Sequence, residues 1–291
     1  MGRNDRPEHT APPEIFYNEE EARKYTDNTR MISIQTSLTE RALELLSLPQ
    51  DGTPRLLLDL GCGSGLSGEA LTEQGHTWVG FDISPAMLDV ARERDVEGDV
   101  AQLDLGHGLP IRPGTFDGAI SISALQWLCN ADNSRHDPRK RLRRFFETLY
   151  ACLSKGARAV LQIYPENTDQ ASMLTSAAMK VGFSGGLVVD FPHSTRAKKF
   201  FLVLMVGGGA MPQARGMNGE EESDSEGGGG SDGGGTVKVA GRRTNKRRKT
   251  GKGEVGRRDW VVKKKQQQRN RGYTTIKQDT KYTGRKRKDR L

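Results

Sequence analysis

The chain has 291 residues, enough for one large domain or two small ones, and its hydrophobic content of 34% is low for a chain packed throughout. Residues 240–291 hold 21 Lys and Arg against 4 Asp and Glu, which leaves 24 basic and 33 acidic residues in 1–239, so an acidic body precedes a basic tail suited to a polyanionic partner. The chain has three scattered cysteines and no CxxC pair, which excludes a disulfide framework and a zinc site and favours a reducing compartment. Residues 1–13 are polar, which excludes a signal peptide. The chain has no long apolar run, which excludes a membrane span.

The elements predicted in chain order begin with helix and continue as a β/α alternation. Residues 14–48 show helical spacing of apolar side chains, and residues 50–54 break it. The pattern then predicts strands at 56–60, 77–82, 100–103, 116–121 and 157–164, an antiparallel pair at 185–191 and 199–206, and helices at 67–74, 84–94, 138–153 and 170–181. We therefore predict a doubly wound α/β fold, mostly parallel, with an antiparallel closing hairpin.

Composition divides the chain into four predicted parts. Residues 1–52 form a helical segment that covers the cofactor site, and residues 53–210 form the catalytic domain. Residues 211–240 are an acidic and glycine-rich linker, and residues 241–291 are a basic tail that we expect to be disordered alone.

A glycine-rich turn after the first strand predicts a nucleotide-type site. Asp59-Leu60-Gly61-Cys62-Gly63-Ser64-Gly65 lies between a strand and a helix, where glycines let backbone amides approach a ligand. Asp82 ends the next strand, where a carboxylate can accept hydrogen bonds from ribose hydroxyls. Residues 63–68 also satisfy the dinucleotide fingerprint G-x-G-x-x-G, so a dehydrogenase is an alternative.

Three features favour S-adenosylmethionine as the ligand. The glycine run begins at Gly61 with Asp59 two residues before it, as in the DxGxGxG pattern of class I methyltransferases, and the closing hairpin is antiparallel. Asp104-Leu105 after the third strand can bind an adenine amino group, although Asp99 is a competing acid, and Asp82 could instead cap a helix. The candidate cofactor-binding residues are Tyr25, Arg30, Asp59, Gly61, Cys62, Gly63, Gly65, Asp82, Ile83, Asp104, Leu105 and Ser121.

The segment after the fourth strand, residues 121–128, should face the accepting atom. It lacks the Asn/Asp-Pro-Pro-Tyr/Phe motif of amine and amide acceptors and the Pro-Cys nucleophile of cytosine C5 enzymes. An acceptor with a ready lone pair remains, and guanine N7 is one, because it needs no general base. No catalytic residue is certain; Ser123, Gln126 and Trp127 are positioning candidates, and Trp127 could equally be a core aromatic.

The tail favours a nucleic-acid substrate. Its candidate RNA-binding residues are Arg242, Arg243, Lys246, Arg247, Arg248, Lys263, Lys264, Lys265, Arg269 and Arg271. Trp260, Tyr273 and Tyr282 could stack on unpaired bases, and residues 242–249 also fit a nuclear localisation signal. A tail that only improves solubility is the simpler alternative.

The sequence resembles the eukaryotic 18S rRNA (guanine-N7)-methyltransferases, ribosome-assembly factors implicated in Williams–Beuren syndrome. The matching stretches are residues 12–17, 24–26, 41–46, 58–65, 80–84, 121–128, 263–272 and 273–287, so the resemblance covers nearly the whole chain. The linker at 219–235 is unusual for the family, which puts only the spacing between body and tail in doubt.

The resemblance implies N7 methylation of one guanosine in small-subunit rRNA, within small ribosomal subunit biogenesis and pre-40S particles. It also implies nuclear, nucleolar and cytoplasmic locations, and a small zinc-binding methyltransferase activator as a heterodimer partner. The strand at 100–103, if it is an edge strand, could pair with that partner. Two alternatives stay open: a pre-ribosome scaffold in which turnover is dispensable, and a small-molecule methyltransferase.

Overall fold

The computed structural model describes residues 6–131, 136–194, 197–208, 216–217, 265 and 278. Contacts between residues group the chain into two units, 1–224 and 225–291. Only Lys265 and Gln278 of the second unit are described, so the architecture below is that of the first unit. The predicted linker and tail therefore lie almost entirely outside the described residues.

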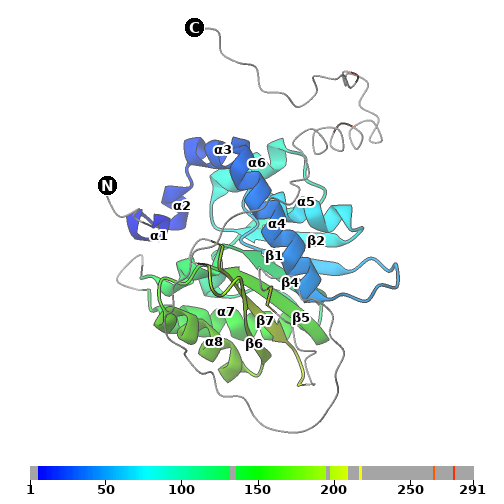
Figure 1. Ribbon diagram of the computed structural model, residues 1–291, viewed down its shortest axis with the longest axis vertical. Coiled ribbons are helices and arrows are strands. Elements are labelled where there is room, and N and C mark those ends of the chain that lie inside the picture. The colour runs from blue at the N-terminus through cyan, green and yellow to red at the C-terminus, as the bar shows by residue number, and fades with distance from the viewer. Residues whose placement is uncertain are drawn as a thin grey trace, which may run out of the picture. The chain divides into compact units, whose positions relative to one another are not determined.

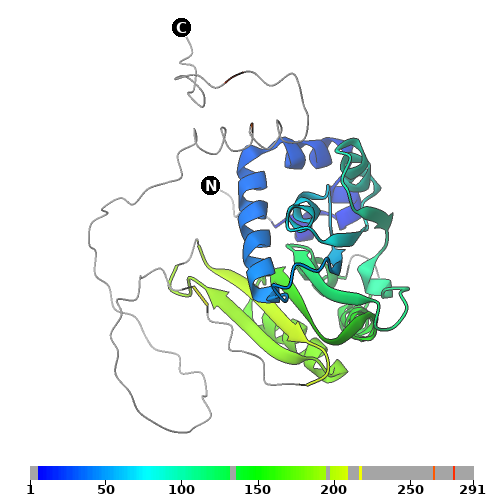
Figure 2. The same ribbon diagram turned by 90° about the vertical axis from the view of Figure 1, so that its right-hand side faces the viewer.

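Seven strands form one sheet, which Figures 1 and 2 show from two sides. The strands are β1 (Leu56–Leu60), β2 (Thr77–Asp82), β3 (Asp99–Gln102), β4 (Phe116–Ile122), β5 (Leu153–Ile163), β6 (Ser184–Asp190) and β7 (Lys199–Met205). Their order is β3-β2-β1-β4-β5-β7-β6, with β7 antiparallel to both of its neighbours and all other pairs parallel. The predicted doubly wound sheet with a closing hairpin is confirmed, and β3 lies at one edge.

Side chains alternate between two hydrophobic cores on the two faces of the sheet. Leu57 packs into one core and Leu58 into the other, and all of β1 after Leu56 is buried. This follows from the two-residue period of a strand, which points successive side chains to opposite faces. A near-continuous apolar run is what a strand needs when helices cover both faces.

Helices from different parts of the chain cover the two faces. The helices α4 (Thr29–Leu46), α5 (Leu66–Glu73) and α6 (Pro85–Glu93) contribute to the core that contains Leu57, and Figure 1 shows α4 crossing in front of the sheet. The helices α7 (Pro138–Cys152) and α8 (Thr168–Val181) pack together and supply the core that contains Leu58. None of the described helices is long and apolar enough to cross a membrane.

The N-terminal segment forms three further helices, α1 (Pro7–Thr10), α2 (Pro13–Phe16) and α3 (Glu19–Asp27). The Asn18 side chain caps α3 and the Asn28 side chain caps α4, each accepting two backbone N–H groups at the start of its helix. Ala22 of α3 packs on Met87 and Val90, so α3 is fastened to α6 by apolar contacts. The sequence pattern did not predict α1, because four residues are too few to show a period.

The fifth strand begins earlier than the sequence predicts. We expected residues 154–156 to be a turn between helix and strand, but β5 already pairs with β4 at Leu153 opposite Phe116. The register then shifts before Gly118 pairs with Arg158, which indicates a bulge. The bulge accommodates Gly156, whose φ of 82° is in the left-handed region. A strand that contains such a residue has no clear two-residue pattern in the sequence.

Trp78 of β2 fixes how closely α5 approaches the sheet. Its side chain is 1% exposed, and its indole N–H donates to Thr72 Oγ1 of α5 at 3.0 Å. A Cβ atom on Gly68 of α5 would lie 2.1 Å from the Trp78 ring, and one on Gly98 would lie 2.2 Å from it. Both positions therefore require glycine for packing rather than for backbone conformation.

Gly68→Ala tests this packing, because helix propensity alone predicts that the change stabilises the protein, whereas the contact with Trp78 predicts that it destabilises the protein. In an unconstrained helix the change stabilises by about 1 kcal/mol, whereas here overpacking should lower the free energy of unfolding by about 1–3 kcal/mol. Urea denaturation of the purified variant measures the difference. Gly186→Ala is the matched control, since its Cβ would meet nothing within 4 Å. A Gly68→Ala protein as stable as wild type would mean that Trp78 can move aside freely.

Candidate functional site

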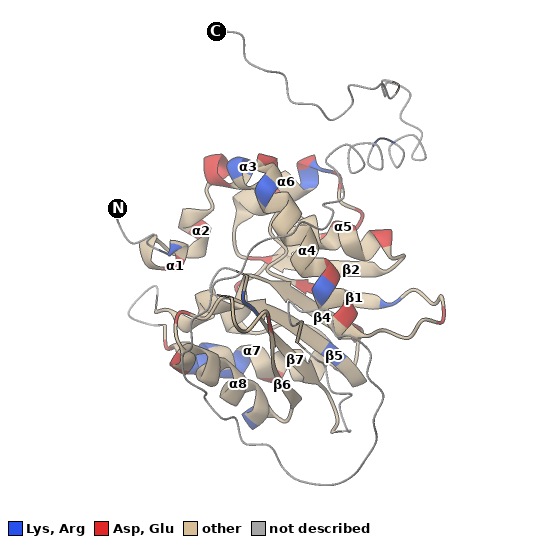
Figure 3. Cartoon of the chain, in the orientation of Figure 1, with Lys and Arg blue, Asp and Glu red and all other residues tan. Residues whose placement is uncertain are grey.

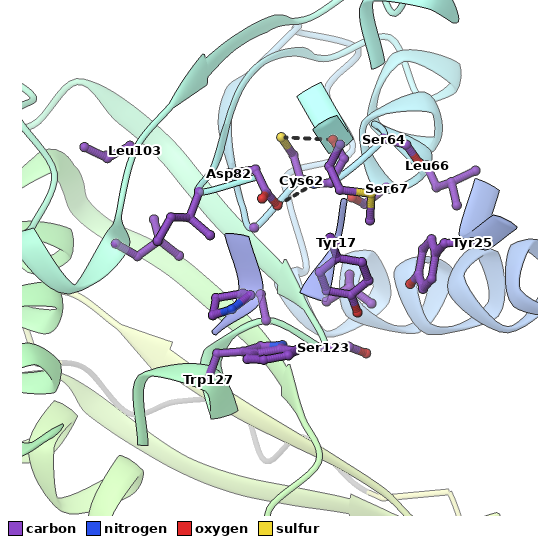
Figure 4. Close-up of a pocket in the computed structure, with 18 of the residues that line it drawn as sticks. Tyr17, Tyr25, Cys62, Ser64, Leu66, Ser67, Asp82, Leu103, Ser123 and Trp127 are labelled. Atoms are coloured by element: carbon purple, nitrogen blue, oxygen red, sulfur yellow. Dashed lines mark hydrogen bonds between the residues drawn. The ribbon is translucent and has the colours of Figure 1, made fainter. Parts of the chain in front are cut away.

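A cavity of about 110 Å³ lies at the carboxyl ends of β1, β2 and β4, where parallel α/β sheets bind ligands (Figure 4). Loops after these strands form its floor, and the N-terminal segment supplies one wall. The lining residues are Pro13, Tyr17, Tyr25, Gln35, Gly61, Cys62, Gly63, Ser64, Leu66, Ser67, Asp82, Ile83, Met87, Leu103, Asp104, Leu105, Ile122, Ser123, Ala124, Trp127, Leu128 and Arg141. Of the described residues, no group of three or more His, Cys, Asp or Glu is placed to hold a metal ion.

The turn at Gly61 packs closely against Ala124, and backbone hydrogen bonds hold it to Phe81. Gly61 has a φ of 77°, and a Cβ there would lie 2.2 Å from the Cβ of Ala124. The amides of Gly61 and Cys62 both donate to the carbonyl of Phe81, at 2.7 and 3.1 Å. The turn thereby presents backbone instead of side chains to the cavity, as the glycine pattern predicts.

Asp82 connects this turn to the start of α6. One carboxylate oxygen accepts from the Gly63 amide at 2.8 Å, and the other accepts from the Ser84 amide at 2.8 Å. Burial raises the pKa of Asp82 above its ordinary value, and the amide hydrogen bonds oppose part of that effect. Both interpretations of Asp82 hold geometrically, since it orders the start of α6 and also lines the cavity.

Asp59 lies behind the glycine turn and does not line the cavity. It is fully buried, and one of its oxygens accepts from Ser67 Oγ at 2.6 Å, while the other has no hydrogen-bond partner among the described residues. Desolvation, with a smaller contribution from the charge of Asp82, raises the pKa of Asp59 to about 7. The Ser67 hydroxyl, which does line the cavity, connects Asp59 to it.

Asp104 is held by an arginine from another element. Its Oδ1 accepts from Arg141 Nη2 of α7 at 2.7 Å and from the Gly106 amide at 2.8 Å. Both side chains of the pair line the cavity and are mostly buried, whereas Asp99 is exposed on the edge strand β3. Of the two acids considered from the sequence, Asp104 is therefore the one at the cavity.

An aromatic cluster forms the wall contributed by the N-terminal segment (Figure 4). The ring of Tyr17 lies 5.8 Å from that of Tyr25 and 6.0 Å from that of Trp127, and Phe16 also lies 6.0 Å from Trp127. Burial raises the pKa of both tyrosines above the ordinary value, so they remain neutral phenols near neutral pH. Ser84 Oγ donates to the Tyr17 carbonyl at 2.8 Å and fixes this wall against the start of α6.

The segment after β4 is ordered by its own hydrogen bonds. Ser123 has a φ of 59°, its hydroxyl donates to Gln162 Oε1 at 2.7 Å, and its backbone carbonyl accepts from Gln126 Nε2 at 2.7 Å. A non-glycine residue in the left-handed region is a sign of local constraint. Ser123 and Trp127 line the cavity, while Gln126 is buried beside it and does not.

The structure brings most of the predicted cofactor-binding residues to one place. Tyr25, Gly61, Cys62, Gly63, Asp82, Ile83, Asp104 and Leu105 line the cavity. Arg30, Asp59, Gly65 and Ser121 do not. Arg30 is exposed on α4, a Cβ on Gly65 would lie 2.7 Å from Val96, and the Ser121 hydroxyl donates to the Leu60 carbonyl at 2.6 Å. The predicted RNA-binding residues of the tail lie outside the described residues, apart from Lys265.

Sequence reasoning missed several lining residues. Arg141 lies among several other basic residues of one helix, so the sequence does not distinguish it from them. Ser64 and Ser67 entered the sequence analysis only as parts of the glycine motif. Tyr17 belongs to the stretch at residues 12–17 that carries part of the family resemblance, and this was the one signal that could have pointed to it. Gln35 and Met87 offered no signal, because each lies in an ordinary amphipathic helix.

Known proteins resemble this chain over nearly its full length. A family model described as "Methyltransferase involved in Williams-Beuren syndrome" matches residues 204–289, and one described as "Methyltransferase domain" matches residues 58–161. The 18S rRNA (guanine-N(7))-methyltransferase of Arabidopsis thaliana is 54% identical over 99% of this chain and 100% of its own, and that of Mus musculus is 52% identical over 99% of both. Among solved structures, a complex between the Haloferax volcanii Trm112 methyltransferase activator and a methyltransferase is similar at 18% identity and a TM-score of 0.47, covering 65% of this chain and 98% of that chain.

The buried carboxyl of Asp59 predicts a specific pH dependence of stability. Folding raises its pKa from 3.8 to about 7, so the folded protein binds the proton more tightly than the unfolded chain. Its contribution is full below about pH 4 and is lost as the pH rises through about 7. Asp59→Asn cannot ionise, so its free energy of unfolding should rise relative to that of wild type by on the order of 3 kcal/mol between pH 4 and 7.

Urea denaturation at several pH values, without ligand, measures this difference. Glu40→Gln, which removes an exposed carboxylate of α4, is the matched control and should track wild type. A constant difference between Asp59→Asn and wild type across the range would contradict the assignment of the raised pKa to Asp59.

Proposed function

The chain belongs to the family of eukaryotic 18S rRNA (guanine-N7)-methyltransferases, and we propose that the cavity at the ends of β1, β2 and β4 is where it brings S-adenosylmethionine and guanosine together. The resemblance seen in the sequence is confirmed by full-length relatives that are more than half identical. The chain is an S-adenosylmethionine-dependent enzyme that methylates N7 of a guanosine in small-subunit rRNA. The observation that carries the proposed site is the bare glycine turn beside Asp82 at the strand ends.

The residues around the cavity fit this methyl donor. Gly61 and Gly63 leave space where side chains would intrude, and the buried Ser64 hydroxyl lacks a hydrogen-bond partner among the described residues. Each oxygen of Asp82 already accepts one amide and keeps a lone pair for a ribose hydroxyl. We assign Asp82 to the ribose for this reason.

Asp104 and Leu105 are assigned to the adenine end. Arg141 fixes the orientation of the Asp104 carboxylate from one side, and the adjacent 3₁₀ helix, Leu105–His107, begins at that carboxylate. A carboxylate held in this way accepts from an amino group, which is what an adenine N6 offers. Tyr25, Gln35 and Ser67 lie elsewhere on the lining and are assigned to the amino acid end of the donor.

The chemistry requires positioning rather than proton transfer by the protein. When bound, the donor supplies an electrophilic methyl group on a sulfonium ion. Guanine N7 carries a free lone pair, so the protein needs to align the two in line and exclude water. Trp127 and Ser123 are the positioning residues for the base, and Tyr17 closes the cavity on the side of the N-terminal segment.

The edge strand β3 is the proposed site for the small zinc-binding activator protein. β3 lies at one end of the sheet, and three of its four residues are exposed. Its outward backbone groups have no strand neighbour in the part of the chain that the structure describes, and a partner strand would supply one. Val100, which packs partly into the core, would then be covered on its open side.

The tail is proposed to bind pre-40S particles and to direct the protein to the nucleus, nucleolus and cytoplasm. Its net charge of +17 from residues 240–291 supports binding to phosphates, and residues 242–249 support nuclear import. Residues 1–239 have a net charge of −9, so the net positive charge of the chain comes from this segment.

Asp82→Ala tests the cofactor site. Loss of two charge-assisted hydrogen bonds should weaken S-adenosylmethionine binding about 100-fold, and N7-methylguanosine in small-subunit rRNA should disappear. Calorimetry measures the affinity, and borohydride–aniline cleavage of rRNA maps the modified base. Asp89→Ala, which removes an exposed carboxylate of α6, is the control. Full methylation by Asp82→Ala would refute the proposed role of Asp82.

A second substitution at Asp82, tested in cells, separates an enzyme from a scaffold. In cells whose only copy of the protein is Asp82→Lys, normal yields of small subunits that lack the methyl group would show that the assembly role of the protein does not require methyl transfer. Reduced yields would make methylation itself necessary.

Gln102→Pro tests the edge of the sheet. The Leu103 amide donates to the Asp82 carbonyl, so by strand alternation the Gln102 amide points away from β2 toward the open edge. Proline there removes the outward N–H without breaking the ladder to β2. We expect co-purification of the activator to fall at least tenfold, while Gln102→Ala, which loses the same side chain but keeps the N–H, retains it. Equal behaviour of the two variants would exclude pairing along β3.

A further inference from the structure

The first two turns of α7 carry an exposed basic surface on the folded body. Arg139, Lys140, Arg143 and Arg144 are all exposed, and the blue of Lys and Arg marks part of α7 in Figure 3. The Lys140 side chain is 87% exposed and that of Arg143 is 77% exposed. These four cations lie within residues 1–239, which have a net negative charge, so they form a basic surface on an otherwise acidic part of the chain.

The position of these cations is unfavourable for the helix itself. The N-terminal end of a helix carries partial positive charge and favours acidic residues, yet α7 has an acidic N-cap, Asp137, and no acidic residue in its first turn, where Arg139 and Lys140 add positive charge. Arg139 with Arg143, and Lys140 with Arg144, are also like-charge pairs at a spacing of four residues, which is destabilising. Local helix stability therefore does not explain the cluster, and a bound polyanion would relieve both effects.

The basic surface begins beside the cavity. Arg141, in the same turns of α7, lines the cavity and contacts Asp104 at 2.7 Å. The preceding 3₁₀ helix, Leu125–Cys129, contains Trp127, the residue proposed to position the base. Because the rise of a helix is about 1.5 Å per residue, Lys140 and Arg144 lie within two turns of this edge.

The two pairs of cations differ in their surroundings. Arg139 and Arg143 line a groove between α7 and α8 that also contains acidic side chains, and Arg143 pairs with Glu147 at 2.7 Å. Lys140 and Arg144 do not line that groove. Lys140 has only a 3.9 Å contact with Asp137, and Arg144 has no ion pair among the described residues. The second pair is therefore the more available for an external anion.

We propose that Lys140 and Arg144 bind backbone phosphates of the rRNA next to the target guanosine. This inference rests on the proposed function and adds to it a binding surface on the body, separate from the tail. Phosphate contacts fix the register of a nucleic acid on a protein without reading its sequence. Contacts at the cavity edge therefore fix how the RNA lies relative to the cavity.

The test compares two double variants of the full-length chain. Lys140→Ala/Arg144→Ala removes the proposed contacts. Arg112→Ala/Lys155→Ala removes the same charge from the opposite edge of the sheet, where β4 and β5 begin and both side chains are exposed. Each is measured with a small-subunit rRNA fragment that contains the target guanosine, for binding as a function of salt and for single-turnover methyl transfer.

We expect the α7 variant to bind the fragment about tenfold more weakly and to lose about 1.5 from the slope of log affinity against log salt, as two phosphate contacts require. Its S-adenosylmethionine affinity should be unchanged, and its thermal midpoint should be equal or higher because like-charge repulsion is removed. The control should match wild type in RNA affinity, salt slope, S-adenosylmethionine affinity, thermal midpoint and single-turnover methyl transfer.

Three outcomes would overturn the proposal. They are an α7 variant that matches the control in RNA affinity and salt slope, a loss of RNA binding accompanied by lower stability, and an equal loss in both variants. In each case wild-type methylation of the fragment shows that the proposed function stands. Absence of methylation by wild type would instead count against the function, whatever the variants do.

Discussion

One backbone turn determines what can be built around it. The amides of Gly61 and Cys62 share the Phe81 carbonyl, which ties the end of β1 to the end of β2, and the Gly63 amide extends the tie to Asp82. On its other side the turn touches Ala124, in the segment that follows β4. Three strand ends therefore converge within contact distance, and this convergence is possible only where the chain carries no side chains.

The electrostatics of the cavity follow from the same convergence. It brings two carboxyl groups, Asp59 and Asp82, near one another in a buried place, and burial raises the pKa of both. Ionised carboxylates in such a place are stabilised by a cationic ligand.

The parts of this site that the sequence predicted are those encoded within a few residues. The strand at Leu56–Leu60, the glycine turn and Asp82 are local patterns, because a buried strand, a tight turn and a strand end each show in adjacent residues. Arg141 could not be predicted, since its role depends on α7 packing against the loop after β3. Tyr17 likewise reaches the cavity only because α3 is fastened to α6.

The same distinction applies to Ser121 and Arg30, which the sequence pattern predicts as cofactor-binding residues but which do not line the cavity. Ser121 follows the right strand, yet its hydroxyl is used within the sheet on the Leu60 carbonyl. Arg30 begins α4 on the exposed side, where the helix turns it away from the cavity. Proximity in sequence to a functional strand therefore predicts the neighbourhood of a side chain and not its direction.

The chain that leads to the tail returns to the sheet before it leaves the described body. The Met217 amide donates to Asp190 at 2.8 Å, the Phe191 amide donates to the Met217 carbonyl at 2.6 Å, and Arg41 of α4 holds the same carboxylate at 3.0 Å. Asp190 ends β6 opposite Lys199, next to the place where β5 also ends, so this anchor lies at the edge of the sheet that carries the cavity. A backbone pair and a buried carboxylate therefore hold Met217 at the same edge of the sheet as the cavity.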